Sequence, residues 1–322
     1  MRFSSRPSLF GSAFIRSFVS GIALCASIVI FSPQNAAAAA DKAGRVVSIG
    51  GALTEIVYAL GRQDDLVAVD TTSVYPPEAL KDKPNVGYMR ALSAEGVLAT
   101  DPGLILMIEG AGPPDALELL EAAGVPIVTV AEEDSKEGIL SKITTVGEAL
   151  GDAEAANGLA QSVGSAMDRV AAKVGAIKGE RKTILFLLSM QGGRLMVGGE
   201  DTQADAVIRL AGGVNAAAGL TGFKPMSNEA IVSANPDVIL MMSGTGMVAP
   251  GADEIFSQPA LSQTKAAKDK ALILMPGMYL LGFGPRTPYA LAELTERLYP
   301  GSFDESDPLL ENMASQSVSE KQ

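Results

Sequence analysis

The segment VGYMRALSAEGVLATDPGLIL, residues 86–106, recurs in altered form as TGFKPMSNEAIVSANPDVIL, residues 221–240. Aligned without gaps, both copies carry a serine where a helix can begin, a glutamate two residues later, and a proline before an apolar strand. The shared positions are Ser93, Glu95, Pro102, Ile105 and Leu106 in the first copy and Ser227, Glu229, Pro236, Ile239 and Leu240 in the second. The copies differ at their head, where Tyr88 is aligned with Gly222.

Short apolar runs on either side of each copy predict the strands of two sheets. RVVSIG, DLVAVD, GLILMI and PIVTV precede residue 131, and TILFLLS, RLMVGG, DVILMMS and ALILMP follow residue 181. Continuous aliphatic runs bounded by Gly, Pro and Asp are typical of parallel strands that are buried on both faces. The stretches ALTEIVYALG, PPDALELLEAAG, TQADAVIRLAGG and TPYALAELTERLY predict helices between them. Each half of the chain is therefore predicted to be an α/β unit.

The segment between the two units has no strand signal and is rich in alanine. DAEAANGLAQSVGSAMDRVAAKVGAIKG keeps an apolar stripe without proline, so it can run as one long helix along both units. The predicted organisation is an N-terminal lobe at residues 41–134, a helical connection at 135–180, a C-terminal lobe at 181–300 and a polar, disordered tail at 301–322.

The first forty residues predict a secretory signal peptide. Arg2, Arg6 and Arg16 precede the apolar stretch FVSGIALCASIVIF, and small residues follow it up to Ala40. The apolar part is too short for a stable membrane span. A lipoprotein would need Cys25 as the acylated residue, but the apolar sequence continues past it, so Cys25 is assigned to the apolar core of the signal. We therefore expect a periplasmic protein.

The composition excludes several classes of function. The chain has 37 acidic and 25 basic residues, and an acidic surface argues against nucleic acid or an anionic membrane as the main partner. It has no histidine, and its one cysteine lies in the signal peptide, so His-based metal sites, thiolate chemistry and Ser-His-Asp catalysis are unavailable to it. SIGGALTE resembles a phosphate-binding loop but lacks the GxGxxG spacing and a Walker lysine. An α/β transferase or hydrolase is therefore a distant alternative.

Two α/β lobes, a long helical connection and a secretion signal resemble the periplasmic substrate-binding proteins whose lobes are joined by a backbone helix. These proteins serve ABC importers of haem, cobalamin and ferric siderophores. Within that class, DTTSVYPPEALKDKPNVGYMRALSAEGVLATDPGLILMIEGAGPP, GRLMVGGEDTQADAVIRLAGG and LLGFGPR resemble the haem-binding branch. The resemblance implies two Rossmann-like lobes with a ligand cleft between them, and haem b as the transported ligand. It implies a binding protein that is not an enzyme.

In that branch the tyrosine of the GYxRxLSAE segment ligates the haem iron, and the arginine two residues later supports it. Here these residues are Tyr88 and Arg90. Ferric iron is a hard Lewis acid, so a phenolate oxygen suits it, and an arginine beside the phenol favours the ionised form. Tyr88 can otherwise be an ordinary loop tyrosine, and Arg90 a surface ion-pair partner. Some relatives add a histidine ligand from the other lobe, which this chain cannot supply.

Further residues are candidates for the haem pocket. Methionines can provide an adaptable apolar wall, aromatic rings can stack on the porphyrin, and cations can meet a haem propionate. The candidates are Met89, Met190, Met241, Met242, Met247 and Met278, the aromatic residues Tyr75, Tyr279 and Phe283, and the cations Lys224 and Arg286. Each of them can equally be a core or surface residue.

The resemblance also implies that Glu95 and Glu229, one in each lobe, dock on cationic pockets of the transmembrane subunits of the ABC permease. From the residues alone, each glutamate can simply complement a helix dipole. An outer-membrane haem receptor system is a further possible partner, and a monomer is expected. The same fold carrying a ferric siderophore or cobalamin is the alternative.

Overall fold

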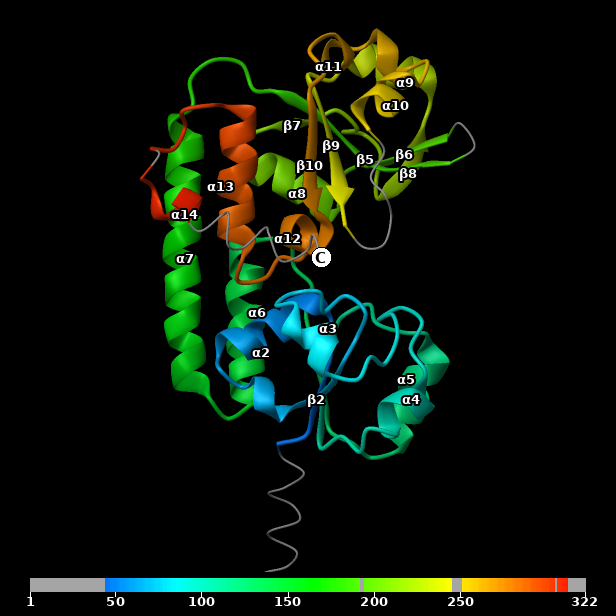
Figure 1. The fold of residues 1–322 in the computed structure, drawn as a ribbon, viewed down its shortest axis with the longest axis vertical. Coiled ribbons are helices and arrows are strands. Elements are labelled where there is room, and N and C mark those ends of the chain that lie inside the picture. Colours follow the sequence, from blue (N-terminus) through cyan, green and yellow to red (C-terminus); the bar gives the residue numbers. More distant parts are fainter. Residues whose placement is uncertain (1–43, 192–193, 245–250, 305, 312–322) are drawn as a thin grey trace, which may run out of the picture.

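The computed structural model describes residues 44–191, 194–244, 251–304 and 306–311 of the 322-residue chain. The predicted signal peptide, Met247 and residues 312–322 lie outside this part. Figure 1 shows two lobes, with helix α7 (Ala153–Ala176) running along both of them. The prediction of two α/β lobes joined by a long backbone helix is confirmed.

The N-terminal lobe is built on a parallel sheet with the strand order β2-β1-β3-β4. Its strands are β1 (Val46–Ile49), β2 (Leu66–Val69), β3 (Leu104–Ile108) and β4 (Ile127–Val130). Its helices are α2 (Gly51–Ala59), α3 (Glu78–Asp82), α4 (Ala94–Leu98) and α5 (Pro114–Ala122), together with the 3-10 helix η1 (Gln63–Asp65). The central strands β1 and β3 are buried on both faces, which is why they appear in the sequence as continuous apolar runs.

The C-terminal lobe contains a mixed sheet with the order β10-β9-β5-β6-β8, and β7 also pairs with β5. Its strands are β5 (Thr183–Gln191), β6 (Arg194–Gly198), β7 (Val214–Asn215), β8 (Phe223–Met226), β9 (Val238–Ser243) and β10 (Leu272–Pro276). Its helices are α8 (Gln203–Leu210), α9 (Asn228–Ala234), α10 (Ala252–Phe256), η2 (Leu261–Gln263), α11 (Lys265–Lys268), α12 (Gly277–Leu281), α13 (Thr287–Leu298) and α14 (Pro308–Glu311).

Strand β6 is antiparallel to β5, and β8 is antiparallel to β6, whereas β5, β9 and β10 are parallel. Only residues 192 and 193 separate β5 from β6. A parallel pair needs a crossover of about a dozen residues or more, so two strands this close in the chain pair in the antiparallel direction.

The sequence repeat is also a structural repeat. Ser93 and Ser227 are the N-caps of α4 and α9, where their side chains accept hydrogen bonds from the backbone N–H groups of Gly96 and Ala230, each at 3.2 Å. At the other end of each helix, Asp101 and Asn235 have left-handed backbones with φ of 49° and 43°. Both precede a proline, which cannot continue a helix. The two copies therefore form the same helix, turn and strand.

The helical connection between the lobes contains a shorter helix, α6 (Lys136–Ala149), which packs antiparallel to the long helix α7. They separate at Gly151, which has φ of 71°. Beside this turn they approach closely, because a Cβ atom on Gly147 would lie 2.1 Å from the Cβ of Ala156. The long helix itself begins after Asp152, as the sequence predicts, and its 24 residues span about 36 Å.

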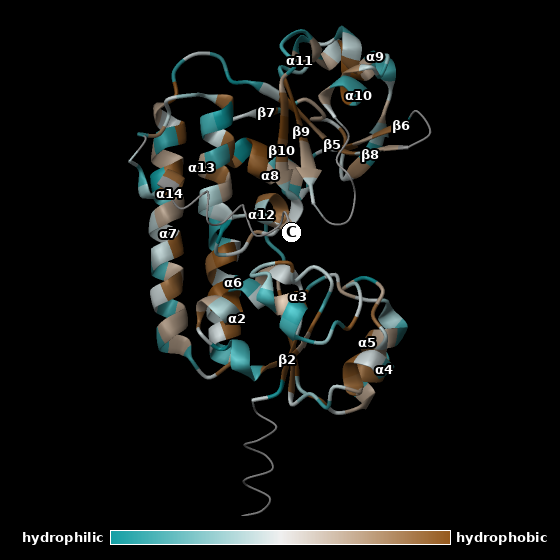
Figure 2. Ribbon diagram, viewed as in Figure 1, coloured by the Kyte–Doolittle hydropathy of each residue, from teal (hydrophilic) through white to brown (hydrophobic). Residues whose placement is uncertain are grey.

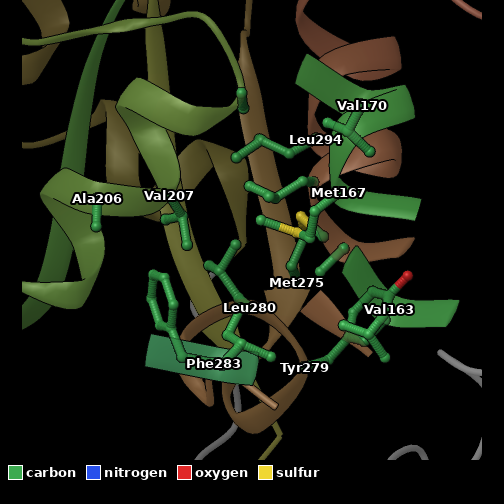
Figure 3. Close-up of a cluster of buried hydrophobic side chains, with 14 of the residues drawn as sticks. Val163, Met167, Val170, Ala206, Val207, Met275, Tyr279, Leu280, Phe283 and Leu294 are labelled. Atoms are coloured by element: carbon green, nitrogen blue, oxygen red, sulfur yellow. The ribbon is translucent and has the colours of Figure 1, made fainter. Parts of the chain in front are cut away.

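The largest hydrophobic cluster continues through both lobes. It contains Leu53 of α2, Val163 of α7 and Leu291 of α13, each at most 5% exposed. Figure 3 shows the part in which side chains of α7, α8, α12 and α13 meet. Figure 2 shows that β9 and β10 are hydrophobic, whereas the outer helices α3 and α10 are hydrophilic. The backbone helix therefore shares one core with the two lobes.

The beginning of the tail is packed, which differs from the expectation of disorder. Phe303 and Leu309 are 4% and 3% exposed and belong to the main cluster. Lys173 of α7 pairs with Asp304 at 3.1 Å and lies over the Phe303 ring. The tail is polar on average, but these two apolar residues are buried in the same hydrophobic cluster as residues of the backbone helix.

Candidate functional site

Tyr88 follows a segment that extends the edge of strand β2. The N–H of Val69 donates to the carbonyl of Pro84, and the N–H of Val86 donates back to Val69, each at 2.9 Å. The N–H of Thr71 then donates to the carbonyl of Gly87 at 2.9 Å. Tyr88 is thereby placed at the carboxyl end of β2.

The residues after Tyr88 are held by the loop that follows β3. The N–H of Gly112 donates to the carbonyl of Met89, and the N–H of Leu92 donates to the carbonyl of Gly112, each at 2.9 Å. The N–H of Ala91 closes a turn onto the carbonyl of Tyr88 at 2.7 Å. Residues 87–92 therefore bridge the carboxyl ends of two parallel strands, which is where open α/β sheets bind ligands.

The carboxyl edge of this sheet faces the C-terminal lobe. Helix α12, which follows β10, contacts the start of α2, which follows β1. A Cβ atom on Gly51 would lie only 2.8 Å from the terminal methyl carbon of Met278. The carboxyl ends of β1 and β10 therefore meet at the junction of the lobes.

Tyr88 is the exposed tyrosine of this protein. Its side chain is 45% exposed, whereas the other five tyrosines, all within the described part of the chain, are half-buried or buried. Arg90 is also exposed and forms no ion pair with any residue that the structure describes. Met89, between them, is half-buried and packs against the core.

The methionines of the C-terminal lobe are mostly packed into its core. Met241 is 5% exposed, and Met190 and Met242 are half-buried against hydrophobic clusters. Met278 is half-buried at the junction of the lobes. Lys224, on edge strand β8, is exposed and has no ion pair within the described residues.

Arg286 does not extend into solvent. Its Nε donates to Oε2 of Glu55 at 2.9 Å, and its Nη2 donates to Oε1 at 2.5 Å. Both side chains are 5% exposed, and the guanidinium carbon lies 3.7 Å from the centre of the half-buried Tyr75 ring. Tyr279 and Phe283 are 1% and 0% exposed in the same region. The structure therefore brings these four candidates together at the junction of the lobes.

Several charged residues at the junction were not anticipated from the sequence. Burial raises the pKa of Glu55, although Arg286 and Lys142 act in the opposite direction. Lys142 of α6 is fully buried, and its Nζ donates to Glu132 Oε1 at 2.8 Å and to the carbonyl of Phe283 at 3.2 Å. The segment LLGFGPR, singled out only by its family resemblance, supplies the partner groups of the C-terminal lobe.

The start of α2 does not form a phosphate-binding loop. The buried carboxylate of Asp70 accepts hydrogen bonds from the N–H of Gly50 at 3.0 Å, the N–H of Thr72 at 3.1 Å and the hydroxyl of Ser73 at 3.1 Å. The N–H of Gly51 donates to the Thr72 hydroxyl at 2.8 Å. The protein's own carboxylate thus occupies the position that a bound phosphate would need.

Glu95 and Glu229 are exposed in the first turns of α4 and α9. Figure 1 shows these helices on the side of the lobes away from α7, one in each lobe.

Within the described residues, the structure shows no group of three or more Asp, Glu, His or Cys side chains that could hold a metal ion. In the same part of the chain, no helix is long and apolar enough to cross a membrane.

Comparison with known proteins identifies the family. The profile of the periplasmic binding protein family matches residues 46–279, so the chain belongs to this family. The uncharacterised ABC transporter substrate-binding lipoprotein YvrC of Bacillus subtilis is 30% identical over 263 residues, which cover 81% of this chain and 82% of that protein.

Two similar solved structures are periplasmic haem-binding proteins. BhuT in complex with two haems is 38% identical, with a TM-score of 0.75 over 79% of this chain and 97% of that chain. RhuT from Roseiflexus sp. RS-1 in its apo form is also 38% identical, with a TM-score of 0.76 over 80% of this chain and 99% of that chain. The family consists of binding proteins, which removes the enzyme alternative.

Proposed function

We propose that this protein binds haem b between its lobes in the periplasm, with Tyr88 as the axial ligand of the iron, and delivers it to an ABC import permease. The observation that carries the proposal is Tyr88 itself, an exposed phenol held by backbone hydrogen bonds at the carboxyl edge of β2 and β3. The similarity to haem-binding proteins such as BhuT and RhuT supports haem as the cargo.

Tyr88 is the sole protein ligand in this proposal. The chain has no histidine, and a thioether is a soft ligand that matches ferric iron poorly. Arg90 donates to the phenolate oxygen and favours its ionised form, since its guanidinium has no carboxylate partner among the described residues. Binding then requires one tyrosine and one cation, both supplied by the N-terminal lobe.

The half-buried methionines and the exposed lysine complete the proposed pocket. Met89, Met190, Met242 and Met278 provide apolar surface for the porphyrin. Lys224 is the candidate for a propionate, because it is exposed and has no ion pair with a described residue. We assign Arg286, Tyr75, Tyr279, Phe283 and Met241 to the framework of the lobes instead, because of their burial or packing.

Delivery uses Glu95 and Glu229 as a pair. They occupy equivalent positions in the structural repeat, so a permease with two equivalent cationic pockets can recognise both lobes at once. The protein acts as a monomer after removal of residues 1–40, and an outer-membrane haem receptor system supplies the haem. The relationship to YvrC, an ABC transporter lipoprotein, supports a transport role.

Titration of the apoprotein with hemin tests the proposal. The wild type should bind hemin, and Tyr88→Phe should weaken binding by at least tenfold, because it removes only the oxygen that contacts iron. Tyr58→Phe, a half-buried tyrosine on α2, is the matched control and should bind like the wild type. Equal affinities of Tyr88→Phe and wild type would refute the ligand assignment.

Thermal shifts with competing cargoes distinguish haem from the alternatives. A ligand that binds only the folded protein raises its melting temperature. Hemin should give the largest shift among hemin, a ferric siderophore and cobalamin at equal concentration. If the siderophore or cobalamin gave a larger shift, that ligand would become the proposed cargo in place of haem, and the fold assignment would be unaffected.

A further inference from the structure

Asn85 contacts the backbone just before Tyr88. Its side-chain oxygen Oδ1 accepts a hydrogen bond from the backbone N–H of Gly87 at 2.8 Å, although Asn85 itself is exposed. An asparagine that bonds the N–H two residues later forms a local turn through its own side chain. The contact therefore fixes the backbone one residue before the phenol.

Gly87, which receives this restraint, has a left-handed backbone. Its φ is 97°, a conformation that glycine adopts easily and other residues rarely adopt. A Cβ atom placed on Gly87 would meet only the carbonyl oxygen of Ala91, at 3.9 Å. Glycine is therefore required for its backbone conformation and not for lack of space.

Hydrogen bonds hold the backbone of Gly87 on both sides of its Cα atom. Its carbonyl accepts from Thr71 N–H at 2.9 Å, and its N–H is held by Asn85. Thr71 lies two residues after the end of β2 and donates its backbone N–H, so the Asn85 contact is the one of the two that depends on a side chain. A substitution of Asn85 can therefore remove one of these two hydrogen bonds and leave the other in place.

We propose that Asn85 is a positioning residue for haem binding, which holds Gly87 so that the Tyr88 phenol is preorganised to bind the iron. The inference rests on the proposed function of Tyr88. Loss of the Asn85 contact leaves Tyr88 in place but lets the Gly87 peptide rotate, so part of the binding free energy is spent on ordering the loop.

The rate of hemin release from the loaded protein to excess apomyoglobin measures this effect. Asn85→Ala should raise the release rate about five- to tenfold, the size expected for one hydrogen bond. Asn85→Asp keeps an acceptor oxygen and should release hemin like the wild type. Gly87→Ala should also accelerate release, because it strains the same peptide.

Gly61→Ala is the matched control for Gly87→Ala. Gly61 also has a positive φ, of 70°, and a Cβ atom placed on it would meet nothing within 4 Å, but it is remote in sequence from Tyr88. The Gly61→Ala variant should release hemin at the wild-type rate, even if urea unfolding shows that the variant is less stable. Equal acceleration in Gly61→Ala and Gly87→Ala would overturn the positioning role, because it would trace release to general destabilisation.

The same assay separates this inference from the proposed function. Tyr88→Ala should release hemin far faster than any of these variants. If Tyr88→Ala releases hemin at the wild-type rate, the proposed function fails. If Tyr88→Ala accelerates release and Asn85→Ala does not, only the role of Asn85 is overturned. The phenolate-to-iron charge-transfer band should weaken in Asn85→Ala and be restored in Asn85→Asp, which a purely structural role would not produce.

Discussion

Arg286 and Glu55 join the two lobes through a buried, bidentate ion pair. Glu55 lies on α2 of the N-terminal lobe, and Arg286 directly precedes α13 of the C-terminal lobe. The Tyr75 ring covers the guanidinium. A second link, from Lys142 to the carbonyl of Phe283, lies in the same junction. These buried contacts link the two lobes directly at their junction.

Removal of one partner of this pair should destabilise the protein strongly. We expect Arg286→Met to lower the free energy of unfolding by about 3 kcal/mol, because it leaves a buried carboxylate without its partner. Urea unfolding measures the loss. Asp253→Asn, which breaks an exposed pair with Lys270, should have little effect. An Arg286→Met protein as stable as the wild type would contradict this account.

Asp134 should make stability depend on pH. Burial, aided by the nearby Glu132 carboxylate, raises the pKa of Asp134 to about 6, while Lys142 and Arg209 oppose the shift. Because the folded pKa lies above the unfolded value of about 3.9, the folded state holds the proton more tightly, and this contribution to stability is lost as the pH rises from about 4 to about 7.

The variant Asp134→Asn should remove that dependence. Its melting temperature, relative to the wild type, should increase between about pH 4 and about pH 7. A constant difference across this range would show that the carboxyl group titrates normally. The side chain is half-buried, so solvent screening reduces the size of the effect.

The close contact of α6 and α7 should tolerate no side chain at Gly147. We expect Gly147→Ala to lower the free energy of unfolding by about 1–3 kcal/mol, because its Cβ would overlap that of Ala156. Gly158→Ala, on the exposed side of α7, has nothing within 4 Å of the new methyl group and should stabilise the helix by about 0.5–1 kcal/mol. Urea unfolding of both variants checks the contrast, and a neutral Gly147→Ala would contradict the observed approach.

Much of the fold could be predicted because its strands and caps are local signals. Apolar runs such as that of β3 identify buried strands without any tertiary information, and Ser93 and Ser227 mark the helix starts that the structure contains. The start of the long helix after Asp152 was predicted, whereas the close approach of Gly147 to Ala156 beside the Gly151 turn has no local signal. The packing of Phe303 and Leu309 was missed because two isolated apolar residues in a polar tail do not form a helical or strand-like hydrophobic pattern.

The candidate site was predictable only in part, for a physical reason. The exposure of Tyr88 and Arg90 agrees with a binding role, but sequence cannot tell an exposed cation from a buried one. Arg286 and Lys224 were therefore equal candidates, although Glu55 neutralises the first and no described residue neutralises the second. Pairing across a sequence separation of 231 residues has no local signature.

Charge reversal of Glu95 and Glu229 should separate docking from cargo binding. The double variant Glu95→Lys, Glu229→Lys should reduce haem transport by at least tenfold in vesicles that contain the permease, while hemin affinity stays unchanged. A second double variant, Glu118→Lys with Glu254→Lys, changes the net charge equally on other exposed glutamates of α5 and α10 and should transport normally. Unchanged transport by the first variant would exclude the docking role.

Resonance Raman spectroscopy of the hemin complex tests most directly whether the Tyr88 phenolate is the ligand of the ferric iron. The wild type should show phenolate bands, Tyr88→Ala should lose them, and Tyr88→His should replace them with an imidazole-ligated spectrum. Phenolate bands that persist in Tyr88→Ala would contradict the central claim and assign the iron to another tyrosine.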